Sequence, residues 1–384
     1  MNQVIKNFAT LENILNNFVN DSNKQDIELC VYSGLRRNIR NLKQKFSSLY
    51  YFAYGIGMEY KFYVSKVIFK IKFDELSHKT KKMFTAHSGI RIDAKNIADN
   101  VIDKIRPYTE IDNWLELLNA VLLFWGGEKE YISKHYTLEN RIADDIINSS
   151  KYSSWKNQKF PMIESPYLKC SRKEIDTMNK TNNGSHLYNL DNDKSFFLAI
   201  DLKCANFQIL RQEGFTKEKS WKDFLNNYVE IDFENPLTSI VEMNAIEYLS
   251  KSKLLRFKSV SRYDLNEHCT LSGNVILMIL DSLIQNGIMT QDSFVAFNGD
   301  EIVFKMNEND MFEHREKCIS FLNENHSNYQ MHVELFQLFK LNTSGQNHYV
   351  KVDKITGKVL FKGVCEDEFL FLIDIWEKQM NELV

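Results

Sequence analysis

The stretch Ser293-Phe-Val-Ala-Phe-Asn-Gly-Asp-Glu-Ile-Val-Phe-Lys-Met306 places four polar residues between two short apolar runs. Asn-Gly between two such runs is the strongest short signal for a β-hairpin, so we expect strands at 294–297 and 302–306. The tip also carries two adjacent carboxylates, Asp300 and Glu301. Adjacent carboxylates repel each other unless a cation or solvent lies between them. The hairpin is therefore either an acidic turn in solvent or one part of a cation site.

Length and composition narrow the class of protein. The chain has 384 residues, of which 43% are hydrophobic and 26% are charged, with only 4 Pro and a net charge of −3. Such a chain can bury a large core and is typical of a soluble globular protein. Its charge gives no overall basic footprint, so a nucleic-acid ligand needs a local basic groove.

Cysteine spacing and the absence of a leader pattern bear on the compartment. The six cysteines form no C-x-x-C pair, and none has a histidine at zinc spacing, so we expect reduced thiols. The first residues show no secretory or Arg-rich transit pattern, and the longest apolar stretch, 120–125, is too short to cross a bilayer. We therefore expect a soluble, cytoplasmic protein without a membrane partner, made by a cell or by a virus.

Residues 1–150 predict a helix-rich N-terminal domain. Apolar spacing and β-branched content predict helices at 4–19, 35–49, 94–105, 111–125 and 131–148, and strands at 27–32, 60–64 and 67–73. The helix at 35–49 is strongly basic, which indicates either a solvated face or a face that contacts phosphates.

The chain changes character at residues 151–194, which are polar and contain Pro161 and Pro166. We expect a domain boundary or a long connection there. In residues 195–384 the pattern predicts strands at 195–200, 294–297, 302–306 and 331–341, a hairpin at 349–364, and helices at 219–229, 240–249, 275–284, 312–325 and 369–380. The expected fold class is α+β, with a helix-rich N-terminal half followed by an antiparallel sheet packed with helices.

A third carboxylate follows the apolar strand at 195–200. Asp201 at this strand end either caps the next helix or lies in a crevice at the sheet edge. Phosphoryl transfer between nucleotides uses two divalent cations about 4 Å apart, held by carboxylates from separate strands. Asp201 and Asp300 can supply these carboxylates, and the backbone carbonyl of Leu202 can serve as a further ligand. Hard oxygen ligands suit Mg²⁺ or Mn²⁺.

Three stretches resemble polymerase motifs. Residues 197–207, Phe-Leu-Ala-Ile-Asp-Leu-Lys-Cys-Ala-Asn-Phe, resemble motif A in its reverse-transcriptase form. Residues 270–274, Thr-Leu-Ser-Gly-Asn, resemble the Ser-Gly motif B of RNA-dependent RNA polymerases, and residues 297–302, Phe-Asn-Gly-Asp-Glu-Ile, resemble motif C. Together they resemble the palm domain of right-hand polymerases. The tip also resembles the Gly-Gly-Asp-Glu-Phe signature of diguanylate cyclases, but the long interval from Asp201 to Asp300 favours the polymerase form.

The resemblance implies a palm-like sheet and a metal-dependent nucleotidyltransferase. It implies two Mg²⁺ or Mn²⁺ ions held by Asp201, Asp300 and the carbonyl of Leu202, with Glu301 as a supporting catalytic carboxylate. Asn206 is expected to contact the sugar, and its amide can bond a 2′-hydroxyl, so ribonucleotides are favoured. The remaining expected contacts to the nucleotide are Lys251, Lys253, Arg256, Lys258 and Ser272, and the expected proton donor is Lys340.

Several alternatives stay open. The basic run 251–262 can also be a solvated edge strand. The expected partners are nucleoside triphosphates with an RNA or DNA template and primer, as for a nucleic-acid polymerase. A second possibility is a cyclic-nucleotide or short-oligonucleotide synthase on the same palm. A third is a catalytically degenerate palm that binds nucleic acid or assists replication, which the apolar helix after Ser272-Gly273 supports.

Overall fold

The structure, a computed structural model, describes residues 26–35, 38–45, 62–70, 73, 76–93, 99–175, 187–229, 236–260, 265–343, 348–365 and 367–382. The chain divides into two compact units. Unit 1 comprises residues 1–142 and 219–256, and unit 2 comprises residues 143–218 and 257–384. This division differs from the one expected at 151–194, because residues 219–256 group with the N-terminal part of the chain.

Unit 1 contains an antiparallel sheet in the order β2-β1-β3. Its strands are β1 (Asp26–Leu35), β2 (Asn38–Lys45) and β3 (Phe62–Lys70). The prediction of a basic helix at 35–49 is wrong, since β2 pairs with β1 from Asn38 to Lys45. Cross-strand pairing here overrides the local preference. The two strands expected at 60–64 and 67–73 form one strand, β3, and the helix expected at 4–19 lies outside the described residues.

Most of the chain from residue 76 to residue 155 is helical. Its helices are α2 (His78–Ser88), α3 (Asp99–Ile105), the 3₁₀ turn η3 (Arg106–Tyr108), α4 (Ile111–Trp125), α5 (Glu128–Asn148) and α6 (Ser150–Trp155). The helix predicted at 111–125 is confirmed as α4, which ends at two glycines with φ of 86° and 110°. These angles lie in the region that glycine adopts without a steric cost.

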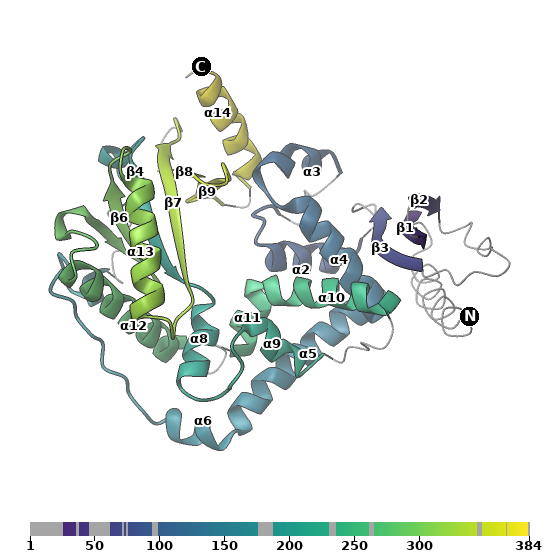
Figure 1. Cartoon of the computed structure of the whole chain (residues 1–384), viewed down its shortest axis with the longest axis horizontal. Helices are drawn as coiled ribbons and strands as arrows, with labels where there is room; N and C mark the ends of the chain where they lie inside the picture. Colours follow the sequence, from purple (N-terminus) through teal and green to yellow (C-terminus); the bar gives the residue numbers. More distant parts are fainter. Residues whose placement is uncertain are drawn as a thin grey trace. The chain divides into compact units, whose positions relative to one another are not determined.

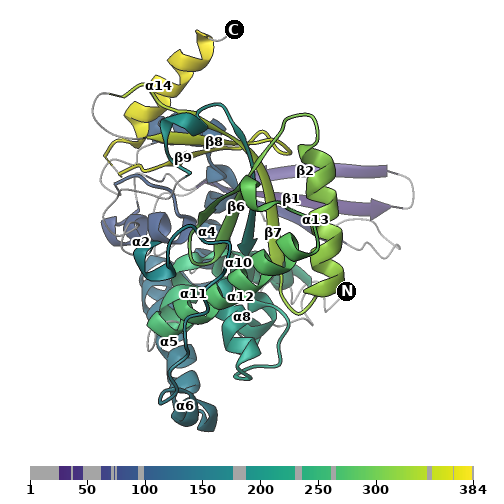
Figure 2. The same ribbon diagram turned by 90° about the vertical axis from the view of Figure 1, so that its left-hand side faces the viewer.

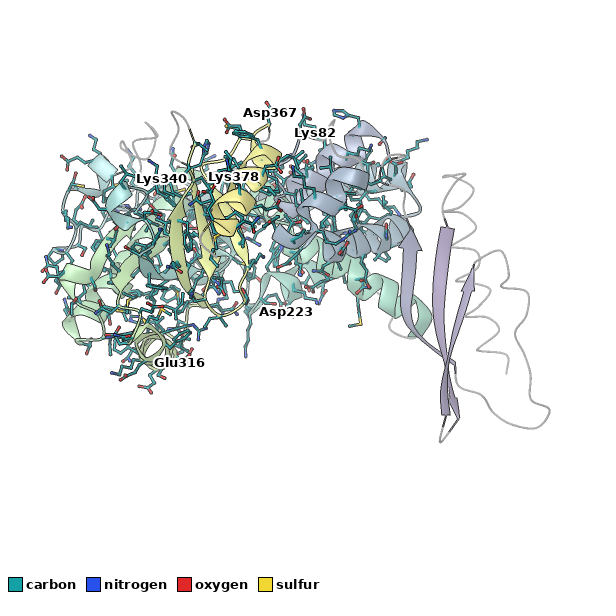
Figure 3. All side chains as sticks on the ribbon, turned by 90° about the horizontal axis from the view of Figure 1, so that it is seen from above. Lys82, Asp223, Glu316, Lys340, Asp367 and Lys378 are labelled. Carbon is teal, nitrogen blue, oxygen red and sulfur yellow. The ribbon has the colours of Figure 1, made fainter. Side chains whose placement is uncertain are left out.

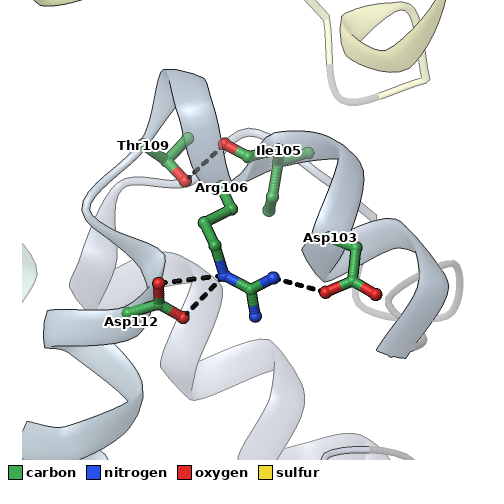
Figure 4. A network of polar contacts seen from close by, with 5 residues as sticks. All are labelled: Asp103, Ile105, Arg106, Thr109 and Asp112. Carbon is green, nitrogen blue, oxygen red and sulfur yellow. Dashed lines mark hydrogen bonds and ion pairs between the residues drawn. The ribbon is translucent and has the colours of Figure 1, made fainter.

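An arginine joins α3, η3 and α4 (Figure 4). The guanidinium of Arg106 donates from Nε to both carboxylate oxygens of Asp112, at 3.0 and 2.9 Å, and from Nη1 to Asp103. The Thr109 hydroxyl donates to the carbonyl of Ile105 at 3.0 Å. The hydrogen bonds to Asp112 and Asp103 raise the pKa of Arg106. This network fixes the bend that follows α3, where Pro107 prevents the helix from continuing.

Residues 219–260 form three further helices, which are α9 (Trp221–Asn226), α10 (Pro236–Lys251) and α11 (Lys253–Val260). Within unit 1, α10 packs against α4. The buried hydroxyls of Tyr131 and Tyr248 hydrogen-bond to each other at 2.7 Å. Burial and this pairing raise the pKa of Tyr248 well above its usual value. Helix α11 also corrects an expectation, because residues 253–260 are helical and not an edge strand.

Unit 2 is built on a six-stranded antiparallel sheet in the order β5-β6-β4-β7-β8-β9. The strands are β4 (Phe196–Leu202), β5 (Phe294–Phe297), β6 (Glu301–Met306), β7 (Met331–Lys340), β8 (Tyr349–Asp353) and β9 (Val359–Lys362). Besides α6, the helices that lie wholly in this unit include α8 (Ala205–Gln212), α12 (Leu265–Gln285), α13 (Met311–Asn325) and α14 (Phe369–Asn381). The α+β class is confirmed, with helices dominating the N-terminal half and this sheet lying in the C-terminal half.

The first four strands of unit 2 have the split βαβ arrangement, in which β4 lies between β6 and β7. Helices α12 and α13 pack against β4, β6 and β7 (Figure 1). Alternate residues of β4 explain this packing, since Leu198 and Ile200 lie in the cluster with α12, whereas Phe197 and Ala199 lie in a second cluster. A strand directs successive side chains to opposite faces, so β4 contributes to a core on each side.

The other end of the sheet is closed by α14, which lies beside β8 and β9 (Figure 2). The ring of Phe369 meets Phe361 of β9 with centroids 5.3 Å apart, and Trp376 meets Phe339 of β7 at 5.4 Å. Edge-to-face aromatic pairs of this kind stabilise a packing interface. None of the helices that the structure describes is long and apolar enough to span a membrane.

Candidate carboxylate site at the end of β4

Two acidic residues face each other at the end of β4. Asp201 is the direct antiparallel partner of Glu301, the first residue of β6. The next backbone amide, of Leu202, donates to the carbonyl of Asp300 at 2.9 Å. Because directly opposed pairs alternate between hydrogen-bonded and non-hydrogen-bonded, Asp201 and Glu301 form a non-hydrogen-bonded pair, in which the side chains lie closest. The acidic hairpin therefore meets the strand-end aspartate, as the sequence predicts.

The hairpin tip is a tight turn. The amide of Asn298 donates to the carbonyl of Glu301 at 2.9 Å, and the amide of Asp300 donates to the carbonyl of Asn298 at 3.0 Å. Gly299 has a φ of 81°, whereas Asp300 is not among the residues with positive φ. A bond from residue i+2 back to residue i across a central residue with a φ near +75° is the pattern of a classic γ-turn, a conformation that glycine adopts without a steric cost. Asn-Gly thus sets the conformation that presents Asp300 beside Leu202.

The Glu301 carboxylate has two side-chain partners, one of them a cation. The side-chain amide of Asn298 donates to Oε2 at 2.9 Å. The ammonium of Lys351, on β8, lies 3.5 Å from Oε1. The side chain of Lys351 is 3% exposed and that of Glu301 is 21% exposed. This is an ion pair largely removed from water, where charges interact more strongly than at the surface.

Sequence reasoning missed Lys351. It stands in the run Tyr349-Val-Lys-Val352, on the same side of β8 as the fully buried Tyr349. A lysine at the inward position of an apolar strand is a signal for a buried charge partner, because lysine is almost never fully buried unless paired. The signal does not name the partner, since β4 and β7 lie between β8 and β6 in the sheet.

The turn from β4 to α8 is held by a buried glutamine. Cys204, the N-cap of α8, has a φ of 56°, which non-glycine residues adopt only at a cost. The side chain of Gln208 donates to the carbonyls of Lys203 and Gln330, and it accepts from the amide of Gln330 at 2.7 Å. The turn is therefore fixed to the loop before β7. It sets α8 directly after the carboxylate, with Asn206, half-buried, as the second residue of the helix.

The backbone arrangement decides which oxygen atoms could bind a divalent cation at this site. Asp201 lies in β4 and Asp300 lies in the turn just before the adjacent strand β6, and both are half-buried. The amide and carbonyl of a strand residue point to the same side, so the carbonyl of Leu202 is directed toward the hairpin tip, where its amide bonds Asp300. Among the residues that the structure describes, no group of three or more His, Cys, Asp and Glu side chains is arranged to hold a metal ion. Carboxylate and carbonyl oxygens are the donor types that Mg²⁺ prefers, and proteins bind this ion through one or two carboxylates together with substrate phosphates.

The stretch around Ser272 lies inside α12, not before a helix as expected. Ser272 is 7% exposed, and its hydroxyl donates to the carbonyl of Cys269 at 3.1 Å. A Cβ at Gly273 would lie 2.1 Å from Nη2 of Arg172. That guanidinium donates to Asn274 at 2.7 Å and to the carbonyl of Cys269 at 2.9 Å. Ser272 and Gly273 therefore have a structural explanation, since they allow a buried arginine to lie against α12.

The predicted basic residues belong to two helices. Lys251 ends α10, while Lys253, Arg256 and Lys258 lie on α11. Lys251, Lys253 and Arg256 belong to unit 1, and only Lys258 belongs to unit 2, which contains the carboxylates. Lys251 lies 3.9 Å from Glu110. The alternation in sequence that indicates a strand thus comes from the junction of two helices.

The predicted proton donor, Lys340, is placed at the wrong end of β7. Asp201 pairs with His332 near the start of β7, whereas Lys340 is the last residue of this strand and pairs with Tyr349. At about 3.3 Å per residue, some 26 Å of strand separates Lys340 from His332. The carbonyl of Lys340 instead accepts from Gln379 of α14 at 2.9 Å, and α14 carries the neighbouring Lys378 (Figure 3).

Comparison with known proteins assigns this chain to no family. No protein-family model matches this chain, and a search of curated proteins finds no match.

Proposed function

We propose that the chain is a metal-dependent nucleotidyltransferase that joins nucleotides, with ribonucleotides favoured. The observation that carries the proposal is the pairing of Asp201 with Glu301, with Asp300 bonded through its carbonyl to Leu202. Like charges directly opposite each other destabilise a sheet. A role in binding cations explains why two carboxylates face each other in this position.

The site residues then have distinct roles. Asp201 and Asp300 hold the divalent cations, and the carbonyl of Leu202 completes their protein ligands. When bound, Mg²⁺ or Mn²⁺ activates the attacking hydroxyl and neutralises the charge of the triphosphate. Glu301 supports the site, and Asn206 contacts the sugar from the first turn of α8.

The resemblance of residues 197–207, 270–274 and 297–302 to motifs A, B and C supports a palm-type polymerase. In that assignment the substrates are nucleoside triphosphates, and the partner is an RNA or DNA template with its primer. Of the basic residues expected to contact phosphate, Lys258 lies in the same unit as the carboxylates. A soluble, cytoplasmic location is part of the same proposal.

A second candidate is a cyclic-nucleotide or short-oligonucleotide synthase that uses the same carboxylates. The observation that favours it is the interior of α12. Ser272 and Gly273 are engaged with Cys269 and Arg172, and the residues that follow them are apolar and mostly buried. This part of α12 therefore offers few polar groups to a template.

Incorporation of labelled nucleotides tests the proposal. The full chain is incubated with Mg²⁺ or Mn²⁺ and labelled NTPs or dNTPs, with and without a primer–template. A polymerase extends the primer and prefers NTPs, whereas a synthase makes product from NTPs alone. If neither product forms, the enzymatic assignments are overturned. Binding of labelled nucleic acid by an inactive chain then identifies a degenerate palm that serves as an accessory protein.

A further inference from the structure

Lys351 is a buried cation within the carboxylate site. The residue is 2% exposed, and the charge of a buried lysine is costly unless it is paired. Its ammonium lies 3.5 Å from Glu301 and 4.1 Å from the centroid of the Phe336 ring. Phe336 in turn stacks on Phe197 of β4 with centroids 5.5 Å apart. The Lys351 ammonium therefore lies over the Phe336 ring and beside Glu301, the first residue of β6.

The partners of this ammonium are few. Within the described part of unit 2, Lys351 has one carboxylate acceptor and one ring face. An ammonium has three N–H donors, and a ring face stabilises a cation without satisfying them all. Glu301 is bound more fully, since Asn298 and Lys351 take one carboxylate oxygen each. Each oxygen of Glu301 thus accepts one hydrogen bond, and Lys351 offsets its charge, so Glu301 serves as an anchor for Lys351.

We infer that Lys351 is a resident cation of the carboxylate site, a positioning residue that neutralises Glu301 and leaves Asp201 and Asp300 to bind divalent cations. The inference rests on the proposed function and sharpens the role of Glu301 from metal support to anchor of Lys351. Asp201 and Glu301 lie opposite each other in the sheet, and Asp300 directly precedes Glu301 at the hairpin tip, so the charge of Lys351 offsets part of the negative charge gathered there. With Lys351 in place, the group stays assembled before any divalent cation arrives.

A fixed positive charge beside the metal ligands lowers their affinity for a divalent cation. Removing the Lys351 charge is therefore expected to raise the affinity for a divalent cation. In Lys351→Met the chain binds Mn²⁺ at least about tenfold more tightly, because one repelling charge at short range is lost. In Glu301→Gln the unpaired Lys351 charge weakens Mn²⁺ binding, again by about tenfold. In the double variant both charges are absent, so affinity returns to near that of the wild type.

Mn²⁺ binding to the full chain, followed by electron paramagnetic resonance of free Mn²⁺, measures these affinities without any nucleotide. Lys305→Met is the matched control. Lys305 lies on the same face of β6 as Glu301, but its ammonium donates to the carbonyl of Asp191 at 3.3 Å and to Asn192 at 3.2 Å. Lys351→Arg keeps the charge and is expected to bind Mn²⁺ as the wild type does. Circular dichroism selects the variants that fold.

The outcomes separate the two proposals. If Lys351→Met and Lys305→Met change Mn²⁺ affinity equally, Lys351 has no specific role and the inference is overturned. If the double variant stays as weak as Glu301→Gln, Glu301 is itself a ligand and the anchor role is wrong. If the wild type binds no Mn²⁺, the proposed metal-dependent function fails instead. Should Lys351→Met not fold, the double variant against Glu301→Gln still decides, since recovery of Mn²⁺ affinity in the double variant is expected only if the unpaired Lys351 charge causes the loss in Glu301→Gln.

Discussion

Asp201 on β4 lies directly opposite Glu301 on β6 as a closely spaced, non-hydrogen-bonded pair. The pairing is fixed by the backbone, because the amide of Leu202 bonds the carbonyl of Asp300 at the hairpin tip. An isolated sheet does not favour two carboxylates in this position. The ion pair between Glu301 and Lys351 offsets part of this repulsion.

This opposition predicts that Asp201→Asn stabilises the fold while it removes activity. Without metal, loss of one of two facing charges is expected to raise the free energy of unfolding by about 0.5 kcal/mol. Urea denaturation in EDTA measures this change. Glu308→Gln, an exposed carboxylate after β6, is the control and is expected to leave stability unchanged. A clear loss of stability in Asp201→Asn would show that this carboxylate serves the fold.

The close approach of Arg172 to α12 predicts the cost of a side chain at Gly273. A Cβ there would meet the guanidinium at 2.1 Å, so Gly273→Ala must displace a buried, hydrogen-bonded arginine. We expect a loss of about 2–3 kcal/mol, typical of overpacking a core. Thermal and denaturant unfolding measure it.

The same substitution in an Arg172→Ala background tests whether the guanidinium causes this loss of stability. In Arg172→Ala the guanidinium is gone, and the same Gly273→Ala change is expected to stabilise α12 by about 1 kcal/mol through helix propensity. Destabilisation of equal size in both backgrounds would contradict the role given to Arg172.

Burial predicts the behaviour of the thiols. Desolvation raises the pKa of Cys318 on α13 to about 12, whereas Cys269 and Cys365 are exposed. Since the thiolate is the reactive form, Cys269 and Cys365 are expected to react with a thiol reagent at pH 8 before Cys318. Mass spectrometry of partly labelled protein checks the order. Labelling of Cys318 as fast as Cys269 in the folded state would contradict it.

The same shift carries a pH dependence. A thiol with a raised pKa in the folded state keeps its proton there, while the unfolded chain releases it above about pH 8.5. The contribution of Cys318 to stability is therefore complete below pH 8.5 and declines as the pH rises toward 12. Cys318→Ala is expected to show a smaller loss of stability between pH 8 and pH 10 than the wild type. An equal loss would assign the alkaline decline to other groups.

Local patterns predicted much of the fold. The helix at 111–125 and the strand at 294–297 have the predicted bounds, because apolar spacing and turn chemistry act over a few residues. The strand β2 was mistaken for a helix, since its residues lack a two-residue alternation and only pairing with β1 reveals it. The grouping of residues 219–256 with unit 1 depends on long-range packing.

Part of the candidate site was predicted from the sequence, and part of it is seen only in the structure. Asp201, Leu202, Asp300 and Glu301 were found from strand ends and a turn, and the structure brings their backbones together. Lys351 was missed because two strands separate β8 from β6, so only the sheet order connects it to Glu301. Ser272 and Gly273 of α12 matched a motif by composition. The close approach of the Arg172 guanidinium to Gly273 also explains why this position has no side chain.

Nucleotide incorporation by Asp201→Asn and Asp300→Asn tests the central claim most directly. The full chain and both variants are given labelled NTPs with Mn²⁺, and Glu308→Gln serves as the control. If the two aspartates hold the catalytic cations, each variant loses incorporation by at least about a thousandfold, while Glu308→Gln keeps the rate of the wild type. Folded variants that incorporate nucleotides as fast as the wild type would contradict the claim.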